Sequence, residues 1–182
     1  TAITELKDGR LVMMLDVERV LSETTKIDDE FLFKDIQPVT DENLTVFYAD
    51  DSSVARGQIQ RTLDALGMKS IAAVNGRAAW DELQKLAAYA ESSGRQVSDM
   101  IQLILTDVEM PEMDGYILTK NVKNDPRFNG IPVLMHSSLS GMSNQQLGHS
   151  VGVDEYVPKF EPQRLAETLA RLAKRLPQTA SV

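Results

Sequence analysis

The feature that most constrains the fold is a pair of short, almost wholly apolar runs that each lead to an aspartate. LTVFYA occupies residues 44–49 and precedes Asp50, and IQLILT occupies residues 101–106 and precedes Asp107. Strands that are buried on both faces have such unbroken apolar runs, whereas strands with one wet face alternate apolar and polar residues. The two runs therefore predict central strands of a sheet that helices cover on both sides.

Helical segments separate these strands from one another. Ser52 or Ser53 is suited to cap the helix that follows the first strand, and Gly67 is suited to end it. The other strands are expected at 70–74, 131–136 and 153–157, with helices at 80–90, 116–123 and 165–176 and a weak, Gly-containing helix at 141–150. A strand followed by a helix, repeated five times, predicts an α/β fold with a five-stranded parallel sheet.

Composition narrows the class of function. The 27 acidic and 19 basic residues give a net charge of -8, which argues against direct binding to nucleic acid. The chain has no cysteine, which excludes disulfides and thiolate metal sites and fits a reducing compartment such as the cytoplasm. No apolar run approaches the ~20 residues that a membrane-spanning helix needs, so membrane insertion is not expected.

Residues 1–43 stand outside the strand–helix alternation and form an N-terminal extension. The apolar run Leu11–Leu15 predicts a strand, and residues 17–23 predict the start of a helix that Asp16 caps. Residues 24–43 are polar and acidic with scattered apolar residues, which is typical of a linker. One strand and one helix cannot bury a core, so we expect this segment to pack on the main domain or to end a domain that precedes it.

Acidic, hydroxyl and amine side chains follow the ends of four predicted strands. They are Asp50 and Asp51, Asp107, Ser137 and Lys159. Parallel strands end at one edge of the sheet, so these side chains are expected to meet there. Three carboxylates at one place repel one another unless a cation joins them, and oxygen-only ligands with open solvent access favour Mg²⁺.

A carboxylate at such a site can act as a nucleophile and form an aspartyl phosphate. Phosphoryl transfer requires mainly positioning and charge neutralisation, which the metal ion and the Lys159 ammonium would supply. The Ser137 hydroxyl and backbone N–H groups near 108–109 and 138 are suited to donate hydrogen bonds to phosphoryl oxygens. The sequence therefore predicts a phosphoacceptor site.

Four motifs resemble those of bacterial response-regulator receiver domains. They are YADDSS, LILTDVEMPEMDG, IPVLMHSS and GVDEYVPKF, and the resemblance covers about residues 43–176. It implies a flavodoxin-like (CheY-like) (βα)5 fold with strand order 2-1-3-4-5, and it leaves residues 177–182 as a flexible tail.

The resemblance assigns a role to each residue of the acidic cluster. It implies that Asp107 is the phosphoacceptor and that Asp50, Asp51 and Asp107 bind Mg²⁺ together with the backbone carbonyl of Glu109. Lys159 would sense the phosphoryl group. A receiver catalyses only its own phosphoryl transfer and autodephosphorylation, so the chain is not expected to be an enzyme with a separate substrate.

The same resemblance makes Ser137 the switch hydroxyl and Tyr156 the switch aromatic. Two positions depart from the family pattern. Receivers usually carry Lys-Pro where this chain has Lys159–Phe160, so the cis peptide bond that such a proline favours is not expected here. Glu109 places a further carboxylate two residues after the acceptor, where it adds negative charge near the site.

The segment ITELKDGRLVMMLDVERVL, at residues 3–21, is similar to the C-terminal end of a CheW-like coupling domain. Residues 1–25 would then be the tail of such a domain and residues 26–42 a linker. A coupling domain followed by a receiver is the arrangement of CheV chemotaxis proteins. The resemblance implies a cytoplasmic adaptor that meets chemoreceptors through the coupling domain and takes its phosphoryl group from the histidine kinase CheA.

Two other functions remain open from the residues. A magnesium-dependent phosphatase of the haloacid-dehalogenase type also uses an aspartyl nucleophile, and such enzymes usually place a second acid two residues later, where Glu109 lies. Against this, no cap domain is evident, and Pro111 and Gly115 match the receiver pattern better. The third possibility is a receiver that acts only as an interaction module without phosphorylation.

Overall fold

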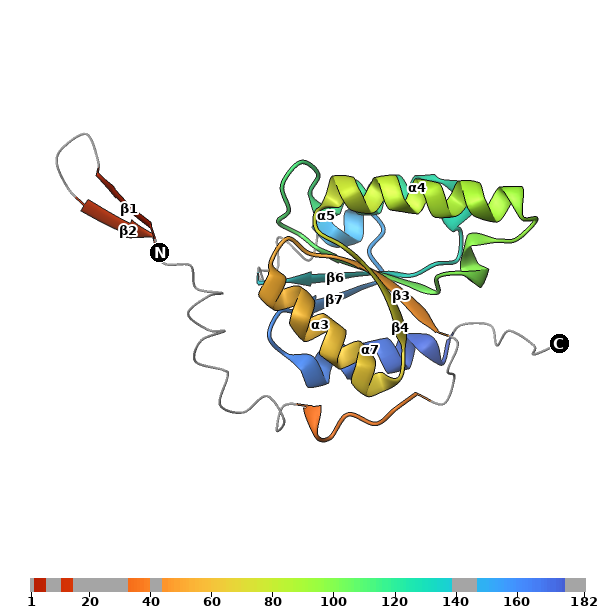
Figure 1. The fold of residues 1–182 in the computed structure, drawn as a ribbon, viewed down its shortest axis with the longest axis horizontal. Helices are drawn as coiled ribbons and strands as arrows, with labels where there is room; N and C mark the ends of the chain where they lie inside the picture. Colours follow the sequence, from red (N-terminus) through yellow and green to blue (C-terminus); the bar gives the residue numbers. More distant parts are fainter. Residues whose placement is uncertain (1, 6–10, 15–32, 40–43, 139–146, 176–182) are drawn as a thin grey trace.

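The computed structural model describes residues 2–5, 11–14, 33–39, 44–138 and 147–175 (Figure 1). Five of its strands form one sheet: β3 (Thr45–Ala49), β4 (Lys69–Ala73), β5 (Leu103–Asp107), β6 (Val133–Ser137) and β7 (Glu155–Pro158). All neighbouring strands are parallel, in the order β4-β3-β5-β6-β7. Numbered from the first strand of the domain, this is the order 2-1-3-4-5, so the predicted flavodoxin-like fold is confirmed.

Among the described residues, four long helices cover the sheet, a pair on each face (Figure 1). They are α3 (Ser53–Leu66) and α7 (Pro162–Ala173) on one face, and α4 (Gly76–Ser92) and α5 (Gly115–Asn124) on the other. Short 3₁₀ turns, η2 (Val97–Asp99) and η3 (Pro126–Phe128), precede β5 and β6, and the sequence analysis did not predict them. No helix among the described residues is both long and apolar enough to cross a bilayer.

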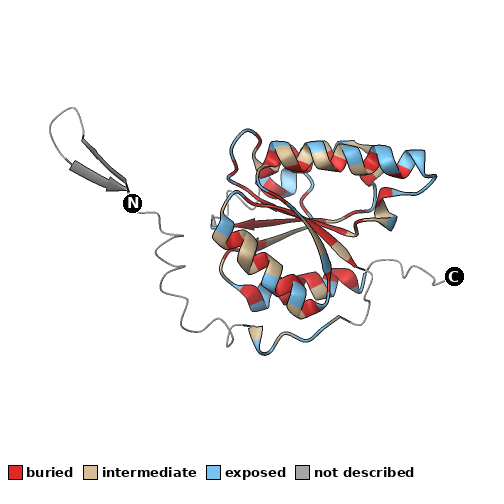
Figure 2. Cartoon of the chain, in the orientation of Figure 1, coloured by how far each residue is buried: buried red, intermediate tan, exposed pale blue. Residues whose placement is uncertain are grey.

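Successive residues of β3 enter two separate cores. Val46 and Tyr48 are buried with residues of α3 and α7, whereas Phe47 and Ala49 are buried with residues of α4 and α5. Because both faces are buried, the strand needs apolar side chains at every position, and this explains the unbroken run in the sequence. Figure 2 shows the consequence, with buried residues concentrated in the central strands and on the inner sides of the helices.

The boundaries of α3 follow from two residues that the sequence analysis named. The Ser52 side chain accepts a hydrogen bond from the backbone N–H of Ala55 at 3.3 Å, which caps the helix. Gly67 ends it with a φ of 74°, a left-handed conformation that glycine adopts at little cost. Of the two candidate caps, Ser52 is therefore the one used.

Outside the five-stranded sheet, the structure agrees only in part with the predictions from the sequence. The strand expected at Leu11–Leu15 is present as β2 (Leu11–Met14), but it pairs antiparallel with β1 (Ala2–Glu5), which was not predicted. The helix expected at 17–23 and the tail at 177–182 lie outside the described residues. Of the weak helix at 141–150, residues 147–150 are described, and they are helical.

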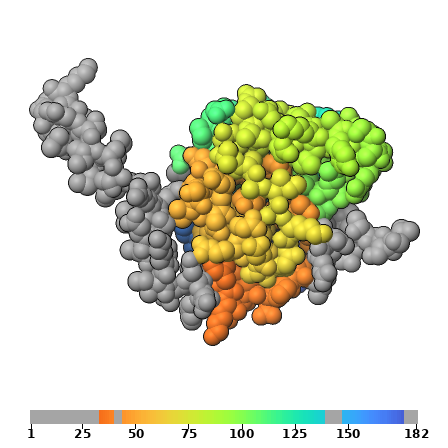
Figure 3. Space-filling model, in the orientation of Figure 1, coloured from red at the N-terminus to blue at the C-terminus, as the bar shows by residue number. Residues whose placement is uncertain are grey.

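Part of the predicted linker, residues 33–39, packs on the domain (Figures 1 and 3). Ile36 and Val39 contact the core between α3 and α7, and the Val39 N–H donates to the Leu66 carbonyl at 2.9 Å. The guanidinium of Arg61 lies over the Phe33 ring, 5.5 Å from its centroid. Since Leu66 is the last residue of α3, these contacts fix the segment at the amino ends of the strands.

Candidate functional site

The carboxyl ends of four strands carry the residues that the sequence analysis singled out. Asp50 and Asp51 directly follow β3, Asp107 is the last residue of β5, Ser137 is the last residue of β6, and Lys159 directly follows β7. These four strands are parallel and lie side by side in the order β3-β5-β6-β7. One rim of the sheet therefore holds side chains that are far apart in sequence.

A buried ion cluster lies at the centre of this rim. The Lys159 ammonium is 3.0 Å from Oδ2 of Asp50 and 3.0 Å from Oδ2 of Asp107. All three side chains are at most 4% exposed. Removing such charges from water is costly unless they pair with each other, so the two carboxylates depend on one shared ammonium for compensation.

Asp51 extends the cluster to the surface. One carboxylate oxygen from each of Asp50, Asp51 and Asp107 lies within 4.8 Å of the other two, and Asp51 is exposed. A set of carboxylate oxygens that is open to solvent on one side fits Mg²⁺, which keeps several of its waters and takes one or two carboxylates. Glu109, whose carbonyl was expected to complete the set, lines a cleft of about 440 Å³ together with Asp51.

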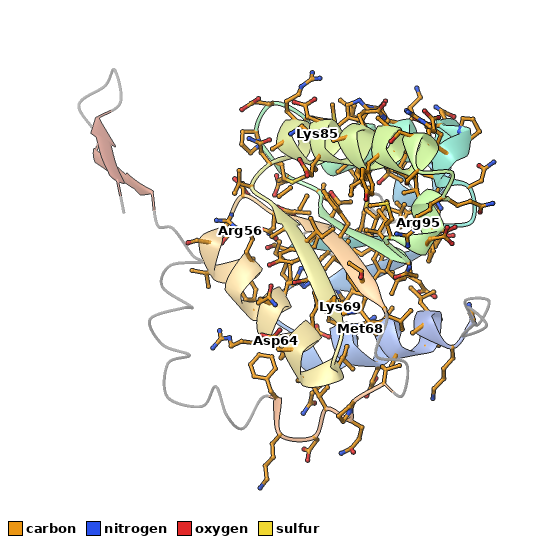
Figure 4. The ribbon with its side chains drawn as sticks, turned by 45° about the vertical axis from the view of Figure 1, so that its right-hand side comes forward. Arg56, Asp64, Met68, Lys69, Lys85 and Arg95 are labelled. Atoms are coloured by element: carbon orange, nitrogen blue, oxygen red, sulfur yellow. The ribbon has the colours of Figure 1, made fainter. Side chains whose placement is uncertain are left out.

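Backbone and side-chain donors hold the two buried carboxylates in place. The Ser52 N–H donates to Oδ1 of Asp50 at 2.9 Å, and the Val108 N–H donates to Oδ1 of Asp107 at 2.7 Å. Arg56 donates from Nη1 to the backbone carbonyl of Asp50 at 2.9 Å, and Figure 4 shows it at the end of α3 nearest the rim. The sequence analysis did not single out Arg56. The only sequence signal for its role is its position in the first turn of the helix that follows Asp50 and Asp51.

The burial of the cluster changes its proton affinities. Desolvation raises the pKa of Asp107, the Lys159 ammonium opposes this rise and the Asp50 charge adds to it, and the net result is a pKa of about 6. Burial lowers the pKa of Lys159, but the charges of Asp50 and Asp107 outweigh it, so the net shift is upward. Desolvation, with Lys159 nearby, lowers the pKa of the buried His136 to about 3. At neutral pH, Lys159 is therefore charged and His136 is neutral.

The loop after β7 places Lys159 without the proline that receivers usually carry. The Lys159 N–H donates to the carbonyl of Ser137 at 3.0 Å, which ties the loop to the end of β6. Phe160 follows in the left-handed region with a φ of 64°, and all peptide bonds of the described residues are trans. A positive φ is uncommon for an aromatic residue, so the surrounding contacts hold this loop in a strained conformation.

The first residue of α5 anchors this helix against the acceptor. Gly115 begins α5, and its N–H donates to the Val108 carbonyl at 2.9 Å. A Cβ atom at this position would lie 2.0 Å from the backbone oxygen of Asp107, so only glycine allows this approach.

Gly115→Ala is therefore expected to destabilise the domain by about 2 kcal/mol because the helix and the acceptor strand must separate. Equilibrium unfolding in urea measures the change. Gly57→Ala is the matched control, since a Cβ atom there would meet nothing within 4 Å and alanine favours the interior of α3. Equal stability of Gly115→Ala and the wild type would show that the close approach does not constrain the loop.

Comparisons with known proteins show which family and which proteins this chain is similar to. A family model described as the response regulator receiver domain matches residues 46–170. The chain is 33% identical over 175 residues to the chemotaxis protein CheV1 of Helicobacter pylori, covering 93% of this chain and 52% of that protein. It is also 35% identical over 128 residues to the chemotaxis protein CheY1 of the same species, covering 69% of this chain and 94% of that protein.

A solved structure of the chemotaxis response regulator CheY4 of Vibrio cholerae superposes with a TM-score of 0.60 at 28% identity, covering 71% of this chain and 98% of that one. The match to the CheY-type proteins thus spans nearly their full length. By contrast, the chain spans about half the length of the CheV-type relatives that it resembles.

Proposed function

The chain belongs to the response regulator receiver family, and from this premise we propose that Asp107 accepts a phosphoryl group and that the phosphorylated domain is a switch in chemotaxis signalling. The observation that carries the proposal is the buried Asp107–Lys159 pair, with 3.0 Å between the charged atoms, beside two further carboxylates. A salt bridge that only stabilised the fold would need one carboxylate beside Lys159. The carboxylates of Asp50 and Asp51 repel Asp107, so a purely structural role does not explain them.

The chain's own groups are arranged for transfer of a phosphoryl group. An Oδ atom of Asp107 would form the new bond to phosphorus while the bond from phosphorus to the donor nitrogen or oxygen breaks. With a pKa of about 6, Asp107 is mostly ionised at neutral pH, as a nucleophile must be. Lys159 already contacts the Asp107 carboxylate, so it is placed to neutralise the charge of the incoming group.

Asp50, Asp51 and Asp107, with the carbonyl of Glu109, would hold Mg²⁺ at the rim. The ion would supply positive charge to the transferred phosphoryl oxygens. Asp50 is fixed by the Ser52 N–H and by its ion pair with Lys159, whereas Asp51 is exposed. The buried acids would thus position the ion and the exposed acid would guide its entry.

Ser137 and Tyr156 are the proposed switch residues. The buried Ser137 ends the strand next to β5, so its hydroxyl is suited to move toward a phosphoryl group on Asp107. Tyr156 is half-buried in β7, opposite Met135 of β6, and its ring would turn into the space that Ser137 leaves. The output would be a changed surface around residues 147–175.

We further propose that the receiver works within a CheV-type coupling protein of the cytoplasm. Residues 1–25 would be the tail of a CheW-like domain, 26–42 a linker, 43–176 the receiver and 177–182 a C-terminal tail. The histidine kinase CheA would donate the phosphoryl group, and the coupling domain would contact chemoreceptors. The similarity to three CheV proteins of Helicobacter pylori along nearly all of this chain supports this arrangement.

Mass spectrometry after incubation with acetyl phosphate and Mg²⁺ tests the proposal. We expect one phosphoryl group on Asp107 of the wild type and none on Asp107→Asn or on the wild type with a chelator. Labelling that survives in Asp107→Asn would refute the assignment. Complete absence of label would indicate a receiver that acts only as an interaction module, and steady turnover of a generic phosphate ester would indicate a phosphatase.

A further inference from the structure

A small apolar cluster connects the acceptor loop with β7. Three buried residues form its centre: Val108, Met135 and Val153. The half-buried side chains of Tyr116 and Tyr156 both pack against this centre. Tyr116 comes from the first turn of α5, the helix that follows β5, and Tyr156 comes from the edge strand β7, so the cluster joins α5 to a strand that is two places from β5 in the sheet.

Tyr116 is rigidly connected to the backbone that carries the phosphoacceptor. Its neighbour Gly115 approaches the Asp107 carbonyl so closely that a Cβ atom would lie 2.0 Å from that oxygen. The Gly115 N–H also donates to the carbonyl of Val108, the residue after Asp107, at 2.9 Å. Because these atoms are tightly packed, a shift of the Asp107–Val108 backbone must also move Tyr116.

Tyr156 lies on the other side of the cluster, against the residues that precede β7. A Cβ atom at Gly148 would lie 3.8 Å from Cδ2 of Tyr156 and 3.5 Å from Sδ of Met135. Gly148 belongs to the helical residues 147–150, so the Tyr156 ring lies beside the segment whose surface is the proposed output. The absence of a side chain at 148 leaves the ring room to turn.

The Tyr116 hydroxyl also lies close enough to Tyr156 to be influenced by it. Burial raises the pKa of Tyr116, and the nearby Tyr156 hydroxyl raises it further, ahead of Asp114 and Glu109. The Tyr116 phenol is therefore neutral at physiological pH. Tyr116 and Tyr156 pack against the same three buried residues, so apolar packing links the two rings.

We propose that Tyr116 is a positioning residue that couples Asp107 to Tyr156, so that a phosphoryl group on the acceptor moves the output aromatic through α5 as well as through Ser137. This inference rests on the proposed function. In this arrangement a movement of the acceptor backbone displaces Gly115, and the Tyr116 ring moves with it. The packing of the Tyr156 ring against Met135 and Val153 then changes. The role proposed for Tyr116 is to position Tyr156, not to take part in the phosphoryl transfer.

Fluorine NMR of the full chain labelled with 3-fluorotyrosine tests the coupling. The chain has four tyrosines, Tyr48, Tyr89, Tyr116 and Tyr156, and single Tyr→Phe variants assign their signals. Beryllofluoride with Mg²⁺ is the probe, and phosphorylation by acetyl phosphate is measured in parallel. We expect the Tyr116 and Tyr156 signals of the wild type to shift at the same beryllofluoride concentration, with Tyr89, 58% exposed on α4, as the unshifted reference.

In Tyr116→Leu, the beryllofluoride-induced shift of Tyr156 should fall by about half or more, as expected for residues coupled through contact. Ile117→Ala is the matched control because Ile117 is the next residue and is 49% exposed, and it should keep the full shift. A full Tyr156 shift in Tyr116→Leu would overturn the coupling. So would a wild-type Tyr116 signal that stays fixed while Tyr156 moves, a result that does not depend on the folding of Tyr116→Leu.

Failure of the proposed function gives a different result. In that case acetyl phosphate leaves Asp107 unlabelled and beryllofluoride shifts none of the four signals in the wild type. The coupling and the switch would then both be wrong. Labelled Asp107 without a response at Tyr116 would overturn the coupling alone.

Discussion

Replacing Lys159 with methionine is expected to destabilise the domain by about 3 kcal/mol at neutral pH without divalent ions and to slow phosphorylation of Asp107 roughly 100-fold. The loss of the ammonium leaves the carboxylates of Asp50 and Asp107 buried at the rim with no cation between them. Urea unfolding measures the first effect, and the rate of labelling by acetyl phosphate measures the second.

Added Mg²⁺ should restore part of the lost stability of Lys159→Met, because an ion that binds only the folded state stabilises it by mass action. Lys85→Met is the control, since Lys85 forms an ion pair with Glu82 at a similar 3.0 Å but on the open surface of α4. That variant should lose about 0.5 kcal/mol or less. Equal losses in the two variants would mean that the buried cluster has no special energetic role.

The Asp107→Asn variant should be more stable than the wild type above pH 6, by about 2–3 kcal/mol in the absence of divalent ions. The pKa of Asp107 is raised from 3.8 to about 6 in the folded protein, so the folded state holds this proton more tightly than the unfolded chain does. As the pH rises from about 4 to above 6, the wild type therefore loses stability that asparagine, which has no charge to bury, retains.

Urea unfolding at several pH values in a chelator measures this difference, which should vanish near pH 4. Asp125→Asn provides a control of opposite sign. Hydrogen bonds from Arg127 lower the pKa of Asp125 to about 2, so its charge stabilises the fold above pH 4 and its removal should be unfavourable at neutral pH. Parallel stability curves for Asp107→Asn and the wild type would contradict the raised pKa.

The central part of the fold follows from the sequence because the core imposes a simple pattern there. The strands β3 and β5 are buried on both faces, and their apolar runs require no other interpretation. The residue at the end of each parallel strand is then fixed to one rim by topology alone. For this reason, the proximity of Lys159 to Asp50 and Asp107 could be expected before any coordinates were known.

The features that the sequence did not reveal depend on single contacts. The strand β1 (Ala2–Glu5) has no apolar run of its own and exists through its pairing with β2. Arg56 reaches the Asp50 carbonyl through one hydrogen bond, and many helix surfaces carry an arginine at such a position. The positive φ of Phe160 likewise results from the loop around it, because aromatic residues rarely adopt that conformation.

The docked residues 33–39 determine where any preceding part of a longer protein would be attached. Val39 is tied to Leu66, at the far end of α3 from Arg56, and Met68 and Lys69 mark that same far end in Figure 4. A five-residue strand such as β3 spans roughly 17 Å, so the anchor of Val39 lies about that distance from the rim that carries the acceptor. In the proposed coupling protein, residues 33–39 would therefore leave the rim around Asp107 open to a phosphodonor.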